Sequence, residues 1–198
     1  MLKGVDISRW QKDKIDKEFL DKQDFVIMKA SEGKSSKDSM LDKWYDMVHG
    51  YSDGEPDQDR CYGFYHYARP EKYTALEEAK NFLKLVRHHA GEAIFALDWE
   101  YKALDYPIER AKEWMDIVYT ETGVRPIIYI QGSKTKDCDI IAQANYGLWV
   151  AHWNATKPDI GAWNRWAIWQ YKVEMNPNID LDYFNGTKEQ WKKYCRRS

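Results

Sequence analysis

Short apolar runs with strand character recur along the chain and are bounded by Gly, Pro or Asn. They are rich in Ile, Val, Phe, Tyr and Trp, the residues that pack well on a pleated surface. The pattern predicts eight strands, at Gly4–Ile7, Phe25–Ala30, Cys61–Tyr67, Ala93–Trp99, Pro126–Ile130, Tyr146–Val150, Trp166–Tyr171 and Ile179–Asp182.

Between these runs, apolar residues recur at intervals of three and four, which places them on one face of a helix. Three such stripes lie within Met40–Val48, Leu76–Val86 and Ile108–Val118. Pro107 and Gly123 flank the third stripe, at the ends where proline and glycine are preferred. Thr187 and Gln190 have capping-box spacing, which predicts a short helix ending near Cys195.

The alternation of strands and helices indicates an α/β fold with mainly parallel strands joined by crossover helices. About eight strands are the number in a closed TIM-like barrel, but 198 residues are few for eight full βα units. Connections become shorter from Pro126 onward, so we expect an irregular barrel with helices missing on one side. We interpret the polar stretch 52–60 as a loop, and residues 1–198 as a single catalytic domain.

Composition narrows the classes of partner. The formal net charge of −2 argues against nucleic acid and against a charged membrane surface. Ten Trp and fourteen Tyr favour a glycan partner, because aromatic faces stack on the C–H faces of sugars. Three cysteines without metal-ligand spacing argue against a disulfide framework.

Targeting signals are not evident in the sequence. No signal peptide is visible and no apolar run approaches the length of a spanning helix, so we expect synthesis in the cytoplasm and no membrane insertion. Action outside the cell would then require release by a membrane-permeabilising partner or lysis, or secretion through a signal that has been removed.

Two carboxylates end the apolar run AIFALDWE. Asp98 and Glu100 stand at i and i+2, so in an extended segment both side chains point to the same face, with Cα atoms ~6.5 Å apart. Barrel enzymes build their sites at the carboxyl ends of their strands. Crowded acids cannot ionise independently, so one pKa should rise and leave a proton donor near neutral pH. The alternative without a catalytic role is that both acids are simply solvated at the end of the strand.

Further acids occur at the first and last predicted strands. Asp6 lies in GVDISRWQ, where it shares a face with Ser8 and would reach the mouth of a barrel. Asp180 and Asp182 repeat the i, i+2 arrangement, and we favour Asp180 as the inward-facing residue. Caps of strand-to-loop turns are the alternative for each of these acids.

Aromatic residues accompany the acids. Tyr65 and Tyr67 share a face at a strand end, which suits sugar binding, whereas His66 lies on the other face and is more typical of a structural histidine. The segments YGLWVAHW and RWAIWQY bring further candidates for a glycan groove, and half of them are expected in the core: Trp149, Trp153, Trp169 and Tyr171.

Taken in order, these segments resemble glycoside hydrolase family 25, the Chalaropsis-type lysozymes that include phage endolysins. The resemblance runs from about residue 1 to 190 and rests on DISRWQ (6–11), KASEG (29–33), GFYHYARP (63–70), ALDWE (96–100), PIIYI (126–130), LWVAHW (148–153), AIWQY (167–171) and DLDYFNG (180–186).

The resemblance implies a flattened barrel of five βα units followed by further strands. It also implies an N-acetylmuramidase that cuts the β-1,4 bond between N-acetylmuramic acid and N-acetylglucosamine in peptidoglycan without metal or cofactor. We separately expect the protein to be a monomer. Glu100 would be the general acid and Asp98 would assist it, with Asp6 and Asp180 as supporting carboxylates. The residues expected to contact the sugar are Tyr65, Tyr67, Tyr129, Trp149, Gln170 and Asp182.

Three mechanisms remain open at this point. A covalent nucleophile requires two carboxyls ~5–5.5 Å apart, inversion requires ~6.5–9.5 Å, and in a third route the substrate's acetamido oxygen attacks the anomeric carbon. We favour the third, because both acids lie on one strand. Two rival functions remain. One is a non-catalytic glycan-binding module, and the other is a metal-dependent phosphoester hydrolase in which Asp6, His66, Asp98 and Glu100 would bind Mg²⁺ or Ca²⁺ through oxygen ligands.

Overall fold

The computed structural model describes residues 1–49, 60–153, 155–174 and 178–197. Nine strands lie in this part of the chain: β1 (Leu2–Ile7), β2 (Phe25–Glu32), β3 (Ser36–Lys37), β4 (Cys61–Tyr67), β5 (Ile94–Asp98), β6 (Ile127–Gln131), β7 (Gly147–Ala151), β8 (Ile168–Glu174) and β9 (Ile179–Phe184). Eight of them form a closed barrel in the order β1-β9-β8-β7-β6-β5-β4-β2, because β1 also pairs with β2; the short β3 extends from β2.

Most of the barrel is parallel, as the alternation of elements predicts. β1, β2, β4, β5, β6, β7 and β8 pair in parallel, and β9 runs antiparallel to both β8 and β1. Five βα units come first, and then β7, β8 and β9 follow with no α-helix between them in the described residues. This arrangement confirms the predicted irregular TIM-like barrel.

The helices are α1 (Lys17–Asp21), α2 (Leu41–His49), α3 (Ala75–Val86), α4 (Ile108–Thr122), α5 (Asp139–Gln143) and α6 (Lys188–Cys195). The residues predicted to begin and end two of these helices are found at those positions. Pro107 precedes α4, and Gly123 follows it with a φ of +74°, a left-handed conformation that glycine adopts without steric cost. Thr187 and Gln190 form a complete capping box at α6. The predicted polar loop at 52–60 lies, apart from Arg60, outside the described residues.

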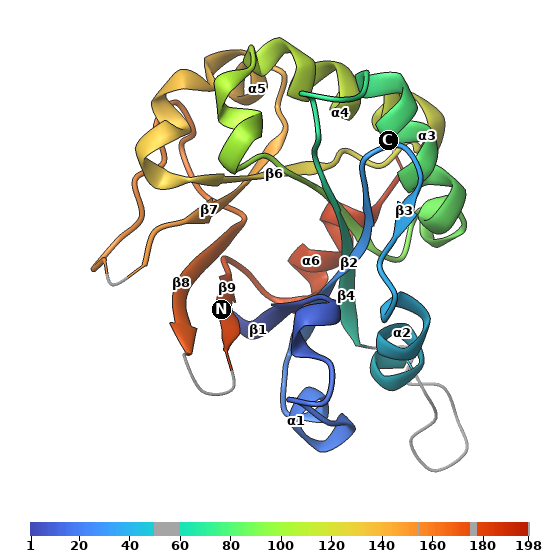
Figure 1. Cartoon of the computed structure of the whole chain (residues 1–198). Helices are drawn as coiled ribbons and strands as arrows, with labels where there is room; N and C mark the ends of the chain where they lie inside the picture. Colours follow the sequence, from blue (N-terminus) through green and yellow to red (C-terminus); the bar gives the residue numbers. More distant parts are fainter. Residues whose placement is uncertain (50–59, 154, 175–177, 198) are drawn as a thin grey trace.

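The helices cover only part of the barrel. In Figure 1, α3, α4 and α5 lie together above the strands and α1 and α2 lie below, whereas β8 and β9 at the left have no helix outside them in this view. No helix among the described residues combines the length and the apolar character needed to cross a bilayer.

Two layers of buried side chains hold the barrel. The outer layer fills the space between strands and helices, with Trp44, Phe82 and Trp114 as its large members. The inner layer fills the barrel, and at its base Trp191 of α6 contacts Phe25 and Phe184 at ring-centroid distances of 4.8 and 5.0 Å. These buried aromatic rings exclude water from the interior of the barrel at this end, so a cavity between the strands can open only at the opposite end.

Candidate active site

The end of β5 places two acids inside the barrel. The strand pairing continues past Asp98, because the Trp99 N–H donates to the Tyr129 carbonyl at 3.0 Å. Glu100 keeps an extended backbone (φ −141°, ψ 177°) before the chain turns into a short 3-10 helix at Tyr101. Trp99 is buried in the outer layer, so its neighbours Asp98 and Glu100 both face inward, as the two-residue alternation predicts.

Two more acids reach the same end of the barrel from different strand directions. Asp6 lies at the carboxyl end of β1 and is directly paired with Asp180, near the start of β9. Because β9 is antiparallel, its first residues lie where the neighbouring strands end. Asp182 pairs with Gly4, deeper in the barrel, and is fully buried.

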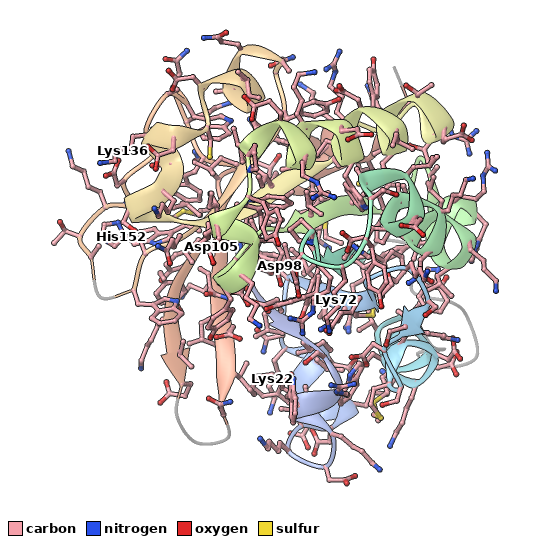
Figure 2. All side chains as sticks on the ribbon, turned by 45° about the horizontal axis from the view of Figure 1, so that its top comes forward. Lys22, Lys72, Asp98, Asp105, Lys136 and His152 are labelled. Carbon is pink, nitrogen blue, oxygen red and sulfur yellow. The ribbon has the colours of Figure 1, made fainter. Side chains whose placement is uncertain are left out.

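The acids open into a cavity of about 310 Å³ at the carboxyl end of the barrel. Nine of the ten predicted site residues line it: Asp6, Tyr65, Tyr67, Asp98, Glu100, Tyr129, Trp149, Gln170 and Asp180. Asp182 is not among its lining residues and is fully buried, so the expected contact of Asp182 with a sugar stays a prediction. In Figure 2, Asp98 projects near the centre of the molecule, whereas Lys136 and His152 lie at its edge.

One amide connects the floor of this cavity. The Gln170 Nε2 donates to Asp6 Oδ2 at 2.8 Å, and the Gln170 Oε1 accepts from the Tyr129 hydroxyl at 3.1 Å and from the Trp153 Nε1 at 2.8 Å. Trp149 Nε1 donates to Asp182 Oδ1 at 2.8 Å. These bonds hold the Gln170 and Asp6 side chains at the cavity floor and the Asp182 side chain below it.

Burial raises the pKa of every acid in the group. The pKa of Glu100 rises from 4.5 to about 7, mainly by desolvation and then by the negative charge of Asp180. Desolvation raises the pKa of Asp180 to about 6 and that of Asp182 to about 8. Asp98 and Asp6 also have pKa values well above 3.8, first because they are buried and then because Glu100 and Asp180, respectively, lie near them. The site therefore holds protonated carboxyls near neutral pH.

A lysine in the cavity wall opposes this accumulation of negative charge. Lys29, buried in the middle of β2, is one of the lining residues, and its charge lowers the pKa of both Asp98 and Glu100. Its Nζ lies 2.7 Å from Glu32 Oε2 and 4.5 Å from the centre of the Tyr67 ring. Sequence reasoning did not assign Lys29 to the site; a lone lysine inside the apolar strand FVIMKASE is the signal that could have indicated it.

Exposed aromatic residues stand at the rim of the cavity. Trp10, Tyr101 and Trp153 are 64%, 74% and 52% exposed, and all three are lining residues. Large apolar side chains left in solvent beside a polar cavity are typical of a ligand-binding surface. Ser8, Gln11, Val173 and Asn178 complete the lining.

Some aromatic candidates lie elsewhere. Trp169 and Tyr171 do not line the cavity: Trp169 Nε1 donates to the His152 carbonyl, and Tyr171 stacks on Tyr183 at 4.1 Å. Their inward neighbour Gln170 takes the cavity-facing position, so the alternation of β8 explains why these rings face outward.

His66 is a structural residue, as expected. Its Nδ1 lies 2.8 Å from Ser31 Oγ, its Nε2 lies 2.9 Å from Glu78 Oε2, and its ring stacks on Trp114. All of these partners lie on the side of the strands away from the cavity, so His66 is not available beside the acids for the metal-dependent alternative. Among the described residues, no group of three or more His, Cys, Asp or Glu side chains is arranged to hold a metal ion.

Comparison with known proteins gives a consistent picture. The sequence model described as Glycosyl hydrolases family 25 matches residues 5–178. The uncharacterized protein YegX of Escherichia coli O157:H7 is 28% identical over 203 residues, which cover 94% of this chain and 71% of YegX. The bacterial lysozyme from Streptomyces coelicolor has a similar structure, with a TM-score of 0.82, 21% identity, and coverage of 98% of this chain and 96% of that one. A family GH25 lysozyme from Aspergillus fumigatus gives a TM-score of 0.79 and 25% identity, with coverage of 98% and 99%.

Proposed function

Because the chain belongs to glycosyl hydrolase family 25 and is thus a glycoside hydrolase, we propose that it is a lysozyme. Its reaction would be hydrolysis of the β-1,4 bond between N-acetylmuramic acid and N-acetylglucosamine in peptidoglycan. The observation that carries this proposal is the pair Asp98 and Glu100, both directed from one strand end into a cavity with an aromatic rim. Lysozymes in both bacteria and fungi share this fold, which supports the assignment.

Glu100 is the general acid of the proposed reaction. A pKa of about 7 leaves a substantial fraction protonated near neutral pH, whereas an ordinary glutamic acid would be ionised there. Glu100 donates this proton to the glycosidic oxygen as the bond from that oxygen to the anomeric carbon breaks. The glutamate then accepts a proton from the attacking water in the second step, which restores the acid.

Asp98 assists through the substrate's acetamido group. Its Oδ1 is buried and has no hydrogen-bond partner among the described residues, so it offers an acceptor to a ligand N–H. In the proposed route the acetamido oxygen bonds to the anomeric carbon as the leaving sugar departs. Asp98 accepts the acetamido N–H and stabilises the resulting oxazolinium, which water then opens with retention of configuration.

The remaining acids support these two. Asp180 raises the pKa of Glu100 by its charge, and Asp6 is held by the Gln170 amide on the cavity floor. Tyr65 and Tyr129 contact Trp149 edge-to-face at 6.1 and 5.0 Å, which forms a rigid aromatic wall against which a sugar ring could rest.

Mass spectrometry of cell-wall digests tests the bond that is cut. We expect muropeptides that end in reducing N-acetylmuramic acid. Reducing N-acetylglucosamine would point to the other glycosidic bond, freed peptides would point to an amidase, and an unchanged wall would favour a binding module. Proton NMR of the first-formed product tests the route, because an inverted anomeric configuration is incompatible with attack by the acetamido group.

A further inference from the structure

A second cavity, of about 430 Å³, lies at the end of the barrel opposite the acids. Arg125 precedes β6, Tyr146 precedes β7 and Arg165 precedes β8, and these strands are parallel to one another. Residues that precede parallel strands lie at their amino ends. The last turn of α6 and the residue after it complete the wall with Lys193, Tyr194 and Arg196.

Every charged residue that lines this cavity is a cation: Arg125, Arg165, Lys193 and Arg196. The side chains of Arg165, Lys193 and Arg196 form no ion pair within the described ranges of the chain. Arg125 is held in place by its bond to the Ala144 carbonyl at 3.1 Å and by the ring of Tyr119, 4.3 Å away. The mouth of the barrel gathers carboxyl groups instead, so the two ends differ in the kind of ionisable side chain that lines them.

The floor of this cavity is ordered by hydrogen bonds. Trp163 Nε1 donates to the Tyr146 carbonyl at 2.8 Å, and the Tyr146 hydroxyl donates to Asp116 Oδ1 at 2.6 Å. Asp116 is itself paired with Lys112 at 2.7 Å, which offsets its charge. Both aromatic residues are buried, so the cations surround a fixed hollow and are not scattered over a mobile surface.

We propose that this cavity, defined by Arg125, Trp163, Arg165, Lys193, Tyr194 and Arg196, binds a phosphodiester-linked polyanion. Guanidinium groups match the geometry of phosphate oxygens, and three of the four cations are arginines. Several cations around one hollow suit a polymer with repeated charges. In the described part of the chain, the mouth is lined by carboxyl groups and by a single cation, Lys29, so the polymer is bound at the base while the mouth stays free for glycan.

The biological setting rests on the proposed function. An anionic polymer attached to the cell wall would bind the cavity at the base of the barrel and so retain the enzyme on the wall. It would not compete with glycan for the catalytic cavity at the mouth. The binding itself does not depend on hydrolysis, so the two proposals fail separately: an enzyme that binds the polymer but cuts no wall would refute only the lysozyme assignment.

Binding of poly(glycerol phosphate) to the full chain tests the inference by calorimetry. The variant R165E/K193E/R196E reverses three exposed cations of the cavity, and K43E/K80E/K84E makes the same change in charge on exposed lysines of α2 and α3. We expect the cavity variant to bind about tenfold or more weakly and the control to lose about twofold or less, with binding that weakens steeply between about 50 and 200 mM salt. Both variants should melt within a few degrees of the wild type, because all six side chains are exposed.

The other outcomes are equally decisive. Equal losses in both variants would mean nonspecific attraction and would overturn the site, as would absence of binding by the wild type. If inorganic phosphate competes as well as the polymer at the same total concentration of phosphate groups, the cavity binds single anions and the proposal of a polymer site is wrong. Tighter binding of single-stranded DNA or of phosphatidylglycerol vesicles, lost in the cavity variant, would assign the cavity to a different class of partner.

Discussion

Replacing Glu100 with Gln separates the proposed catalytic role of this acid from its cost to stability. The pKa of Glu100 is about 7 in the folded protein and 4.5 ordinarily. A carboxyl with a raised folded pKa favours folding below its unfolded pKa, and that contribution is lost as the pH rises through the folded value. Wild-type stability should therefore decline between about pH 4.5 and pH 7 as this group ionises, whereas the glutamine, which cannot ionise, escapes the decline.

The magnitude follows from the shift. The difference between a pKa of 4.5 and one of about 7 corresponds to about 3 kcal/mol as an upper limit. Glu100 is only partly buried and shares its charge interaction with Asp180, so we discount this by about half, to about 1.5–2 kcal/mol. For a domain of this size that corresponds to a rise in Tm of about 3–8 °C.

Thermal unfolding at pH 4 and pH 8 measures this effect. Glu100→Gln should melt higher than the wild type at pH 8 and within about 1 °C of it at pH 4, while turnover of cell walls falls about 10²–10⁴-fold. The matched control is Glu113→Gln, on the exposed face of α4, which should change neither Tm nor turnover. An unchanged or lower Tm for Glu100→Gln at pH 8 would refute the reasoning, because it would mean that ionised Glu100 is not disfavoured in the folded protein.

Three further variants probe the site. Gln170→Leu leaves the buried Asp6 without its amide donor and should cost about 1–3 kcal/mol in urea unfolding together with most of the activity; an unaltered midpoint would show that the amide is dispensable. Lys29→Met removes the cation that lowers the pKa of Glu100, so the alkaline limb of the pH–activity profile should move to higher pH; a move to lower pH would contradict this. Tyr101→Ala at the exposed rim should raise KM about 2–10-fold for glycan with little change in kcat, and an effect confined to kcat would argue against a stacking role.

Local patterns predicted much of the fold. The two-residue period of a strand was enough to direct Asp98 and Glu100 to one face, and the three-residue spacing of Thr187 and Gln190 was enough to mark the start of α6. The one-turn helices α1 and α5 gave no such signal, because five residues are too few for a helical period to repeat. The identity of the acids and the location of the barrel mouth could therefore be predicted from the sequence, since both follow from short stretches of it.

The depth of each acid depended on long-range pairing that no local pattern records. Asp180 and Asp182 have the same spacing and the same facing, yet one lines the cavity and the other lies beneath it. The register that pairs Asp180 with Asp6 and Asp182 with Gly4 decides this, and it joins residues more than 170 positions apart. The direction of β9 is equally nonlocal, because a parallel β9 would have placed its first residues at the base.

The antiparallel last strand also explains how so many buried acids can share one cavity. In a wholly parallel barrel, an acid at the mouth must stand at the end of a strand, next to the turn that follows. Here β9 brings Asp180 to the mouth from its start and then carries Asp182 below the floor, where Trp149 satisfies one oxygen of its carboxyl. Each added acid raises the pKa of its neighbours, so Asp180 helps to keep Glu100 protonated. This crowding of acids lowers the stability of the folded protein at neutral pH. The same repulsion raises the pKa of Glu100 and so leaves it with a proton to donate.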